Sequence, residues 1–136
     1  MNQIIKGCGF HHVAIWTGDW ETSLRFYTEG LGFQPKIEWG EIPSRAVMLD
    51  TGDGNYLEIF EREASSQRVG EANILHLCFR TSDCAGAVEA ARNAGATVQT
   101  ETFSPETFQK IGLDAKIAFI LGPSGEIIEF FECSQL

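Results

Sequence analysis

Residues 10–19, Phe-His-His-Val-Ala-Ile-Trp-Thr-Gly-Asp, decide the fold because residues 74–83, Ile-Leu-His-Leu-Cys-Phe-Arg-Thr-Ser-Asp, repeat their pattern. In each stretch an Asp lies seven residues after a His, at positions 12 and 19 and again at positions 76 and 83. Each copy also ends alike: around Glu58 and Glu129, a Gly lies four residues before the Glu and another Glu three residues after it. A repeat of this kind indicates two copies of one structural unit. The sequence therefore predicts two equivalent modules, each carrying one His and one Glu at matching positions.

Each module is expected to fold as a βαβββ unit. Alternating β-branched and aromatic residues are typical of strands, and an Asp just before an apolar helical repeat is typical of an N-cap. We expect strands at 10–16, 33–39, 45–50 and 56–61 in module one, with a helix from Asp19 to about Gly30. We expect strands at 74–80, 97–103, 116–121 and 126–132 in module two, with a helix from Asp83 to Ala94. The fold class is α+β.

The 136 residues suit one domain, with module one at about 8–62, a polar linker at 63–73 and module two at about 74–133. The His-to-Glu interval is 53 residues in module two against 46 in module one. We expect the extra residues in a loop at 104–114, with Phe108, Ile111 and Leu113 exposed.

The matching His and Glu residues are expected to share one sheet face in each module, because alternate residues of a strand point the same way. Glu58 and Glu129 stand inside apolar stretches, where an unpaired carboxylate would be costly to bury. By contrast, His11 is expected to be a packed or exposed strand residue and not a metal ligand. The carboxylates expected to face solvent are Glu61, Glu126 and Glu132.

Two imidazoles and two carboxylates form a ligand set for a divalent metal. We therefore predict one divalent metal per site, Zn, Ni, Co, Mn or Fe, bound by His12, Glu58, His76 and Glu129. The alternative is a degenerate site that binds its ligand without a metal. An octahedral ion would leave two positions for adjacent oxygens of a substrate, as in an enediolate, and would stabilise their charge.

Composition limits the partners. The net charge is -9 and the pI about 4.7, so nucleic acid and anionic membrane surfaces are not expected as partners. No apolar run approaches the roughly 20 residues of a membrane helix, and Met1–Gly9 lacks the pattern of a signal peptide. The four cysteines show no CxxC pairing and are expected as reduced thiols in a cytoplasmic protein.

The chain resembles the vicinal oxygen chelate superfamily, which includes glyoxalase I, methylmalonyl-CoA epimerase, extradiol dioxygenases, and fosfomycin and bleomycin resistance proteins. The resemblance covers nearly the whole chain. The motifs that carry it are His12–Ile15, Ser23–Tyr27 followed by Gly30–Phe33, Tyr56–Phe60, His76–Phe79, and Gly122–Gly125 leading to Ile128–Phe130. It implies paired βαβββ modules whose curved mixed sheets surround a metal cleft. It also implies a homodimer, which the supply of ten Phe and three Trp favours as well.

The ligand order His, Glu, His, Glu is that of glyoxalase I, whereas extradiol dioxygenases use two His and one Glu, and the epimerase usually has Gln where this chain has Glu58. Glyoxalase I carries a glutathione-binding Arg four residues after its first His, and here that residue is Trp16. Whether glutathione takes part is therefore open.

We predict a metal-dependent lyase or isomerase of the glyoxalase type, which transfers a proton through a metal-bound enediolate of a small carbonyl substrate. Glu129 is the expected base, with Glu58 as the second catalytic carboxylate. One alternative is a thiol or water transferase like the fosfomycin resistance proteins. Another is a non-catalytic protein that binds a drug, as bleomycin resistance proteins do.

Five further residues are expected to contact the substrate, a partly apolar small molecule with one anionic group. Cys78 is included because it lies two residues after His76 and should share its face. For Trp16, packing in the core is an equally good interpretation. The predicted substrate-binding residues are Trp16, Trp39, Cys78, Arg80 and Phe108.

Overall fold

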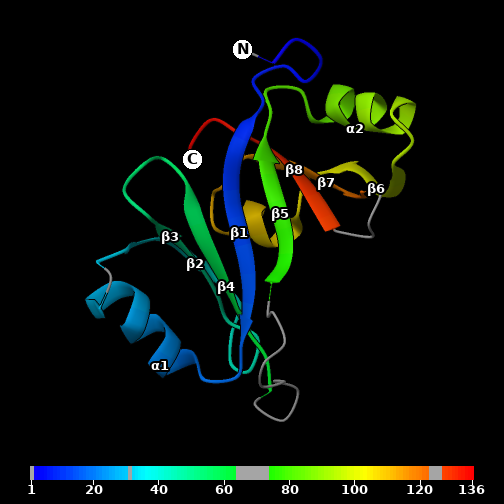
Figure 1. The fold of residues 1–136 in the computed structure, drawn as a ribbon. Coiled ribbons are helices and arrows are strands. Elements are labelled where there is room, and N and C mark those ends of the chain that lie inside the picture. The colour runs from blue at the N-terminus through cyan, green and yellow to red at the C-terminus, as the bar shows by residue number, and fades with distance from the viewer. Residues whose placement is uncertain (1, 31, 64–73, 123–126) are drawn as a thin grey trace. The chain divides into compact units, whose positions relative to one another are not determined.

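The computed structural model describes residues 2–30, 32–63, 74–122 and 127–136, and within them each module has the expected βαβββ order (Figure 1). The elements of the first module are β1 (Gly9–Thr17), α1 (Trp20–Arg25), the π-helical turn η1 (Phe26–Gly30), β2 (Gln34–Trp39), β3 (Ala46–Asp50) and β4 (Tyr56–Glu61). Those of the second are β5 (Ile74–Arg80), α2 (Cys84–Asn93), β6 (Thr97–Phe103), α3 (Glu106–Lys110), β7 (Ala115–Leu121) and β8 (Ile127–Cys133). The predicted α+β class and the predicted strands are confirmed.

Some predictions fall outside the described residues. All of the predicted linker except Glu63 does so, as do Glu126 and residues 123–125 of the Gly122–Gly125 motif. Within the described ranges, no helix is long and apolar enough to span a membrane.

The chain divides into two compact units. The first unit is His12–Leu75, and the second unit combines Met1–His11 with His76–Leu136. The N-terminal residues belong to the second unit because they bond to it: Thr81 Oγ1 donates to the carbonyl of Lys6 at 2.9 Å. The strand β1 thus starts in the second unit and continues in the first.

In the first unit the strands follow the order β2-β3-β4-β1, with β1 parallel to β4 and the other neighbours antiparallel. The helix α1 begins after Asp19, whose carboxylate accepts the N–H of Thr22 at 3.1 Å as an N-cap should. Trp20 of α1 is 7% exposed and packs with Val47 and Ile59, so the helix covers the aliphatic face of this sheet.

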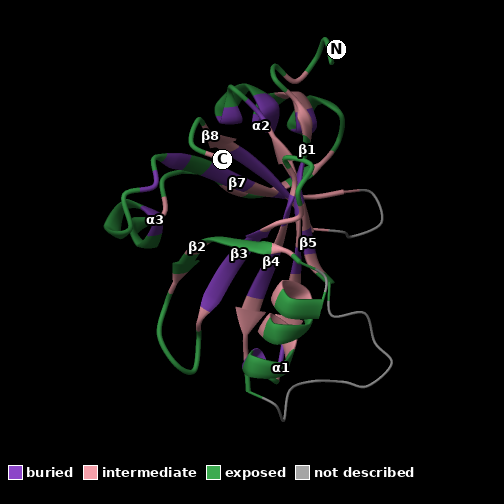
Figure 2. Cartoon of the chain, turned by 90° about the vertical axis from the view of Figure 1, so that its left-hand side faces the viewer, coloured by how far each residue is buried: buried purple, intermediate pink, exposed green. Residues whose placement is uncertain are grey.

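In the second unit the order is β5-β8-β7-β6, with β5 parallel to β8. The N-cap Asp83 accepts the N–H of Gly86 at 2.9 Å. Helix α2 has one buried and one exposed face in Figure 2, and its buried residues, among them Val88, pack with Ala118 and Phe130. The predicted helix from Asp83 to Ala94 is therefore confirmed.

Residues 104–114 differ from the prediction. They contain the short helix α3, and Phe108 and Leu113 are 7% and 4% exposed, so the expectation that both are exposed is wrong. The Phe108 ring lies edge-on to Phe131 with their centroids 6.2 Å apart. The additional residues of module two thus fold onto the core of the second unit, and Ile111 alone of the three predicted residues is exposed, at 42%.

Candidate metal centre

The first His–Glu pair is held by the parallel strands β1 and β4. Their register sets Ala14 beside Glu58, and His12 precedes Ala14 by two residues, so its side chain shares that face. His12 Nε2 lies 3.2 Å from Glu58 Oε2, and the two side chains are 0% and 4% exposed. The predicted pairing within module one is therefore present in the first unit.

The second pair is built in the same way by β5 and β8. Cys78 lies beside Glu129, and His76 again precedes it by two residues. His76 Nε2 lies 2.9 Å from Glu129 Oε2, with side-chain exposures of 6% and 4%. The Phe119 ring stands edge-on to the His76 imidazole, with the ring centroids 5.7 Å apart.

A divalent metal fits this donor set. Burying a carboxylate costs several kcal/mol unless a cation compensates, and each unit buries one. Bonds of about 2.0–2.2 Å from an ion to imidazole nitrogen and carboxylate oxygen place neighbouring ligand atoms about 3 Å apart. The separations of 3.2 and 2.9 Å agree with that value. Each pair is therefore arranged as two adjacent ligands of one ion would be.

Two predicted substrate-binding residues lie on the ligand face of the first unit. Trp16 pairs in register with Phe60, and Trp39 pairs with Ala46, which itself pairs with Phe60. The Trp16 and Trp39 rings lie 5.7 and 5.9 Å from the Phe60 ring. These aromatic side chains stand two residues further along their strands than the level of Glu58.

The other three predicted substrate-binding residues belong to the second unit. Cys78 is fully buried beside Glu129. Arg80 directs its Nε to the carbonyl of Phe10 at 3.1 Å, and Phe108 is buried against Phe131. Their contact with a substrate stays a prediction.

The sequence predictions did not name Phe60 or Arg62 as site residues, although alternation sets Phe60 on the face of Glu58. The guanidinium of Arg62 lies over the Trp16 ring, 5.6 Å from its centroid. Continuing the alternation from Phe60 to position 62 would have placed Arg62 on that face as well.

Two carboxylates expected to face solvent take part in ion pairs instead. The side chain of Glu61 is only 13% exposed because it accepts two side-chain hydrogen bonds from Arg45, at 2.8 and 2.7 Å. Glu132, 25% exposed, accepts from Lys116 Nζ and from the N–H of Cys84, both at 2.8 Å. His11, expected as an ordinary residue, is buried with its ring 4.4 Å from Phe131.

Solved structures of the same fold are numerous, whereas no curated protein sequence matches the chain. Methylmalonyl-CoA epimerase from Mycobacterium tuberculosis is 20% identical, with a TM-score of 0.74 over 98% of this chain and 93% of that one. A variant of the Streptomyces coelicolor methylmalonyl-CoA epimerase in complex with 2-nitronate-propionyl-CoA is 22% identical, with a TM-score of 0.69 over 96% of both chains. A hypothetical protein from Bacillus halodurans C-125 is 16% identical, with a TM-score of 0.70 over 93% of this chain and 95% of that one.

These likenesses show a shared fold. The sequence itself matches a family profile over residues 9–130, nearly its full length. That match spans both βαβββ modules and both His–Glu pairs. The chain belongs to the Glyoxalase/Bleomycin resistance protein/Dioxygenase superfamily.

Proposed function

We propose that this chain is a metal-dependent lyase or isomerase of the glyoxalase type, which moves a proton at the carbon next to a carbonyl group of a small substrate. The observation that carries the proposal is the pair of buried His–Glu contacts, one in each unit, at 3.2 and 2.9 Å. The similarity to methylmalonyl-CoA epimerases supports the isomerase form of this chemistry.

The proposed site holds one divalent ion, Zn, Ni, Co, Mn or Fe, with His12, Glu58, His76 and Glu129 as ligands. Two neutral imidazoles and two carboxylates balance the charge of such an ion. When bound, the ion acts as a Lewis acid that stabilises negative charge on the substrate's carbonyl oxygen.

Glu129 is the proposed base. Its carboxylate accepts the proton as the substrate C–H bond breaks, and the electron pair of that bond moves to the carbonyl oxygen to give an enediolate or enolate. When the proton is returned to the neighbouring carbon, Glu129 gives back the proton that it took. Inversion at the same carbon needs a second proton from the opposite side. Glu58, the equivalent carboxylate of the first unit, is the proposed acid for it: Glu58 enters the step protonated and leaves it ionised, Glu129 stays protonated, and exchange with solvent restores both groups.

The most direct test measures exchange of a substrate C–H proton with solvent deuterium by NMR. The panel contains the methylglyoxal–glutathione adduct, α-hydroxy carbonyl compounds and acyl thioesters. Exchange should require the metal, and Glu129→Gln should slow it by about 10²–10⁴-fold, the usual effect of removing a general base. Glu132→Gln is the matched control, because Glu132 lies on the same strand but bonds to Lys116.

Metal content is measured on the same samples. About one ion per chain is expected, and full occupancy in the double variant His76→Ala, Glu129→Ala would place the metal elsewhere. If no panel member exchanges while an aromatic drug binds tightly to the metal-free protein, the chain sequesters ligands and the proposal is wrong.

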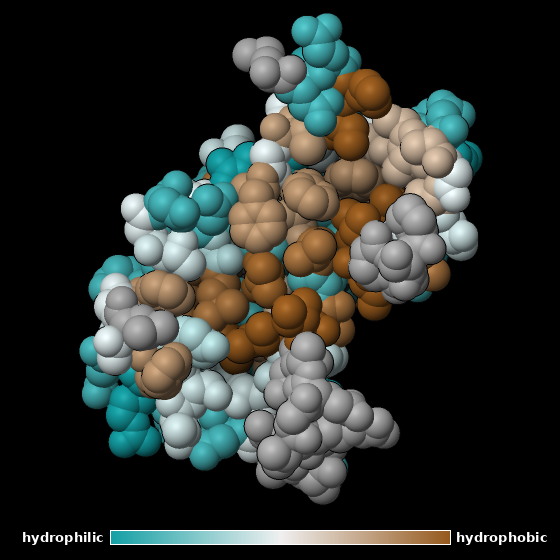
Figure 3. Space-filling view, in the orientation of Figure 1, coloured by the Kyte–Doolittle hydropathy of each residue, from teal (hydrophilic) through white to brown (hydrophobic). Residues whose placement is uncertain are grey.

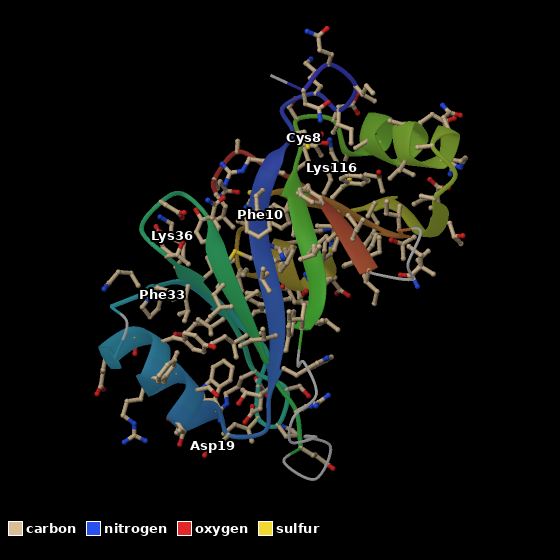
Figure 4. The ribbon with its side chains drawn as sticks, in the orientation of Figure 1. Cys8, Phe10, Asp19, Phe33, Lys36 and Lys116 are labelled. Atoms are coloured by element: carbon tan, nitrogen blue, oxygen red, sulfur yellow. The ribbon has the colours of Figure 1, made fainter. Side chains whose placement is uncertain are left out.

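We also propose a homodimer, since strands β1 and β5 expose apolar side chains. Phe10 and Ile74 are 42% and 58% exposed, and the Phe10 ring stands edge-on to Phe79 at 6.2 Å. Apolar side chains gather over β5 in Figure 3, and Figure 4 shows Phe10 on β1. Exposed apolar patches of this kind mark interaction surfaces. Sedimentation at micromolar concentration should give twice the chain mass of 15.0 kDa, and a mass of one chain would contradict the dimer.

A further inference from the structure

A row of aromatic side chains crosses the ligand face of the first unit. Across the strands β2-β3-β4-β1 the register aligns Trp39, Ala46, Phe60 and Trp16. Ala46 is small, so the Trp39 and Phe60 rings meet over it in an edge-to-face contact at 5.9 Å. The Trp16 ring completes the row 5.7 Å from Phe60.

The row stands close to the proposed metal ligands. Glu58 and Phe60 are two residues apart on β4 and point to the same face, a distance of about 7 Å along a strand. The register neighbours of Glu58 are Ala14 and Met48, and both are fully buried. The three aromatic residues of the row are partly exposed. A ligand anchored at His12 and Glu58 therefore meets these rings next.

Positive charge lies at the far side of the row. Arg62 follows β4 in the same alternation as Glu58 and Phe60, and its guanidinium lies 5.6 Å from the Trp16 centroid. The backbone N–H of Arg62 donates to the carbonyl of Thr17 at 2.9 Å, which fixes the residue to the end of β1. In a chain of net charge -9, a cation held over the Trp16 ring at the end of the row favours an anionic group there.

The matching row of the second unit is filled. By register it consists of Phe103, Ile117, Phe131 and Arg80. Phe131 is 1% exposed because the Phe108 ring of α3 and the His11 ring both pack on it, and Ile117 takes the place that small Ala46 has in the first unit. In the second unit α3 lies between β6 and β7. The corresponding strands of the first unit, β2 and β3, are connected by residues 40–45, which contain no helix. The equivalent aromatic position is therefore closed in one unit and accessible in the other.

We propose that Trp16, Trp39 and Phe60 form a subsite for a flat apolar group of the substrate, with Arg62 pairing with an anionic substituent at its far end. The proposal rests on the proposed function, since the metal site anchors the other end. It assigns the substrate class as carbonyl compounds that carry an aromatic or other planar group, with a carboxylate or similar anion beyond it.

Hydroxamates serve as probes because they present two adjacent oxygens to a metal. Four are compared by calorimetry on the Zn²⁺-loaded protein: acetohydroxamate, hexanohydroxamate, cinnamohydroxamate and 4-carboxycinnamohydroxamate. We expect cinnamohydroxamate to bind at least about 10-fold more tightly than hexanohydroxamate, because its ring stacks in the row. The 4-carboxylate should strengthen binding further, by about 3-fold or more, through Arg62.

Variants then show which residues cause the two gains in affinity, the one from the ring and the one from the 4-carboxylate. Trp39→Ala should remove the preference for the ring, and Arg62→Gln should remove only the gain from the carboxylate. Phe103→Ala is the matched control, since Phe103 occupies the register position of Trp39 in the second unit and is 43% exposed. Affinity for acetohydroxamate should stay the same in all three.

A measurement on the unaltered protein guards against misfolded variants. The indole N–H signals of Trp16 and Trp39 should shift in NMR spectra when cinnamate is added, even without metal. The Trp20 signal is the internal reference, because Trp20 is buried with Val47 on the opposite, aliphatic face.

The outcomes separate the two proposals. If acetohydroxamate binds but the ring brings no gain and the indole signals stay in place, the subsite is wrong and the metal site stands. If acetohydroxamate fails to bind while cinnamate shifts the two indoles, the subsite stands and the proposed function fails.

Discussion

The strand that carries the His is joined to the following helix in the same way in both units. The N–H of Asp19 donates to Thr17 Oγ1 at 3.1 Å, and that of Asp83 donates to Thr81 Oγ1 at 3.0 Å. Each Asp then caps its helix. Both threonines lie five residues after a His, so the repeat extends to the bonds that orient each helix.

The ion pairs beyond the site are also equivalent. Arg45 lies opposite Glu61 in the first unit, and Lys116 lies opposite Glu132 in the second. Each Glu follows a proposed metal ligand by three residues and therefore points to the other face. The duplicated part of the molecule thus includes the framework that holds the ligands as well as the ligands themselves.

The units differ in the side chains just beyond the ligands. The first unit has the partly exposed row of Trp16, Phe60 and Trp39, and the second has Phe131 covered by Phe108. The comparison teaches that the two units have the same buried His–Glu contact, whereas the neighbouring positions differ: aromatic rings are partly exposed in the first unit and packed in the second.

The largest expected effect tests the equivalence of the two pairs. His12→Ala and His76→Ala should each weaken metal binding by more than about 100-fold, because loss of an outer-shell partner alone commonly costs 10–100-fold. Metal titration with a competing chelator measures both. Strong loss in one variant with an unchanged affinity in the other would show that only one unit supplies ligands.

The next effect tests the covering of the second unit. Phe108→Ala should lower the free energy of unfolding by about 3–5 kcal/mol, as expected for a buried aromatic side chain. Ile111→Ala, at the end of the same segment and 42% exposed, should change it by less than about 1 kcal/mol. Urea denaturation compares the two, and equal small losses would mean that α3 contributes little to the core.

A smaller effect tests the helix caps. Asp19→Ala and Asp83→Ala should each reduce stability by about 1 kcal/mol, the usual value for an N-cap carboxylate. Similar losses of stability in thermal unfolding would confirm that the two N-caps are equivalent. A loss confined to Asp83→Ala would show that only α2, the longer helix, depends on its cap.

The smallest effect concerns the stability of the fold at low pH. Hydrogen bonds from Arg45 lower the pKa of Glu61. For Glu132, burial raises the pKa, but the hydrogen bonds from Lys116 and Cys84 outweigh it and the net pKa is lowered. A lowered pKa stabilises the fold at pH values above the unfolded value, about 4.3, and that stability is lost as pH falls through the folded pKa.

Glu61→Gln should therefore lower the Tm at pH 7 and leave it less sensitive to acid between pH 5 and 3. Glu132→Gln should do the same to a smaller extent, because burial opposes its ionisation. Thermal unfolding across this pH range measures both slopes. An unchanged acid slope in Glu61→Gln would show that its pair with Arg45 adds no stability.

The sequence was sufficient for the strands and the helix starts because they depend on local patterns. Alternation sets the face of each strand, and Asp19 and Asp83 mark the helix starts. The position of each Glu beside its His also depends on the pairing of β1 with β4 and of β5 with β8, and local patterns do not specify that pairing.

What the sequence could not provide depends on contacts between distant residues. Phe108 looked exposed because a five-residue helix leaves almost no periodic pattern, and its burial depends on Phe131 in another strand. Glu61 looked exposed because nothing local indicates that Arg45 will lie opposite it. Arg62 lies one residue beyond the strand predicted at 56–61, so the alternation of that strand did not assign it to a face.

Because Met1–His11 belongs to the second unit, the two repeats of the sequence cannot simply be separated into two folded halves. The sequence repeats start at residues 10 and 74, but a polypeptide from Ile74 to Leu136 would lack residues that its own fold uses. It would lose the His11 ring beside Phe131 and the carbonyl of Phe10 that Arg80 bonds. The copied segment and the folding unit therefore have different boundaries. An exchange of the C-terminal half would keep these two contacts only if residues 10 and 11 were exchanged with it.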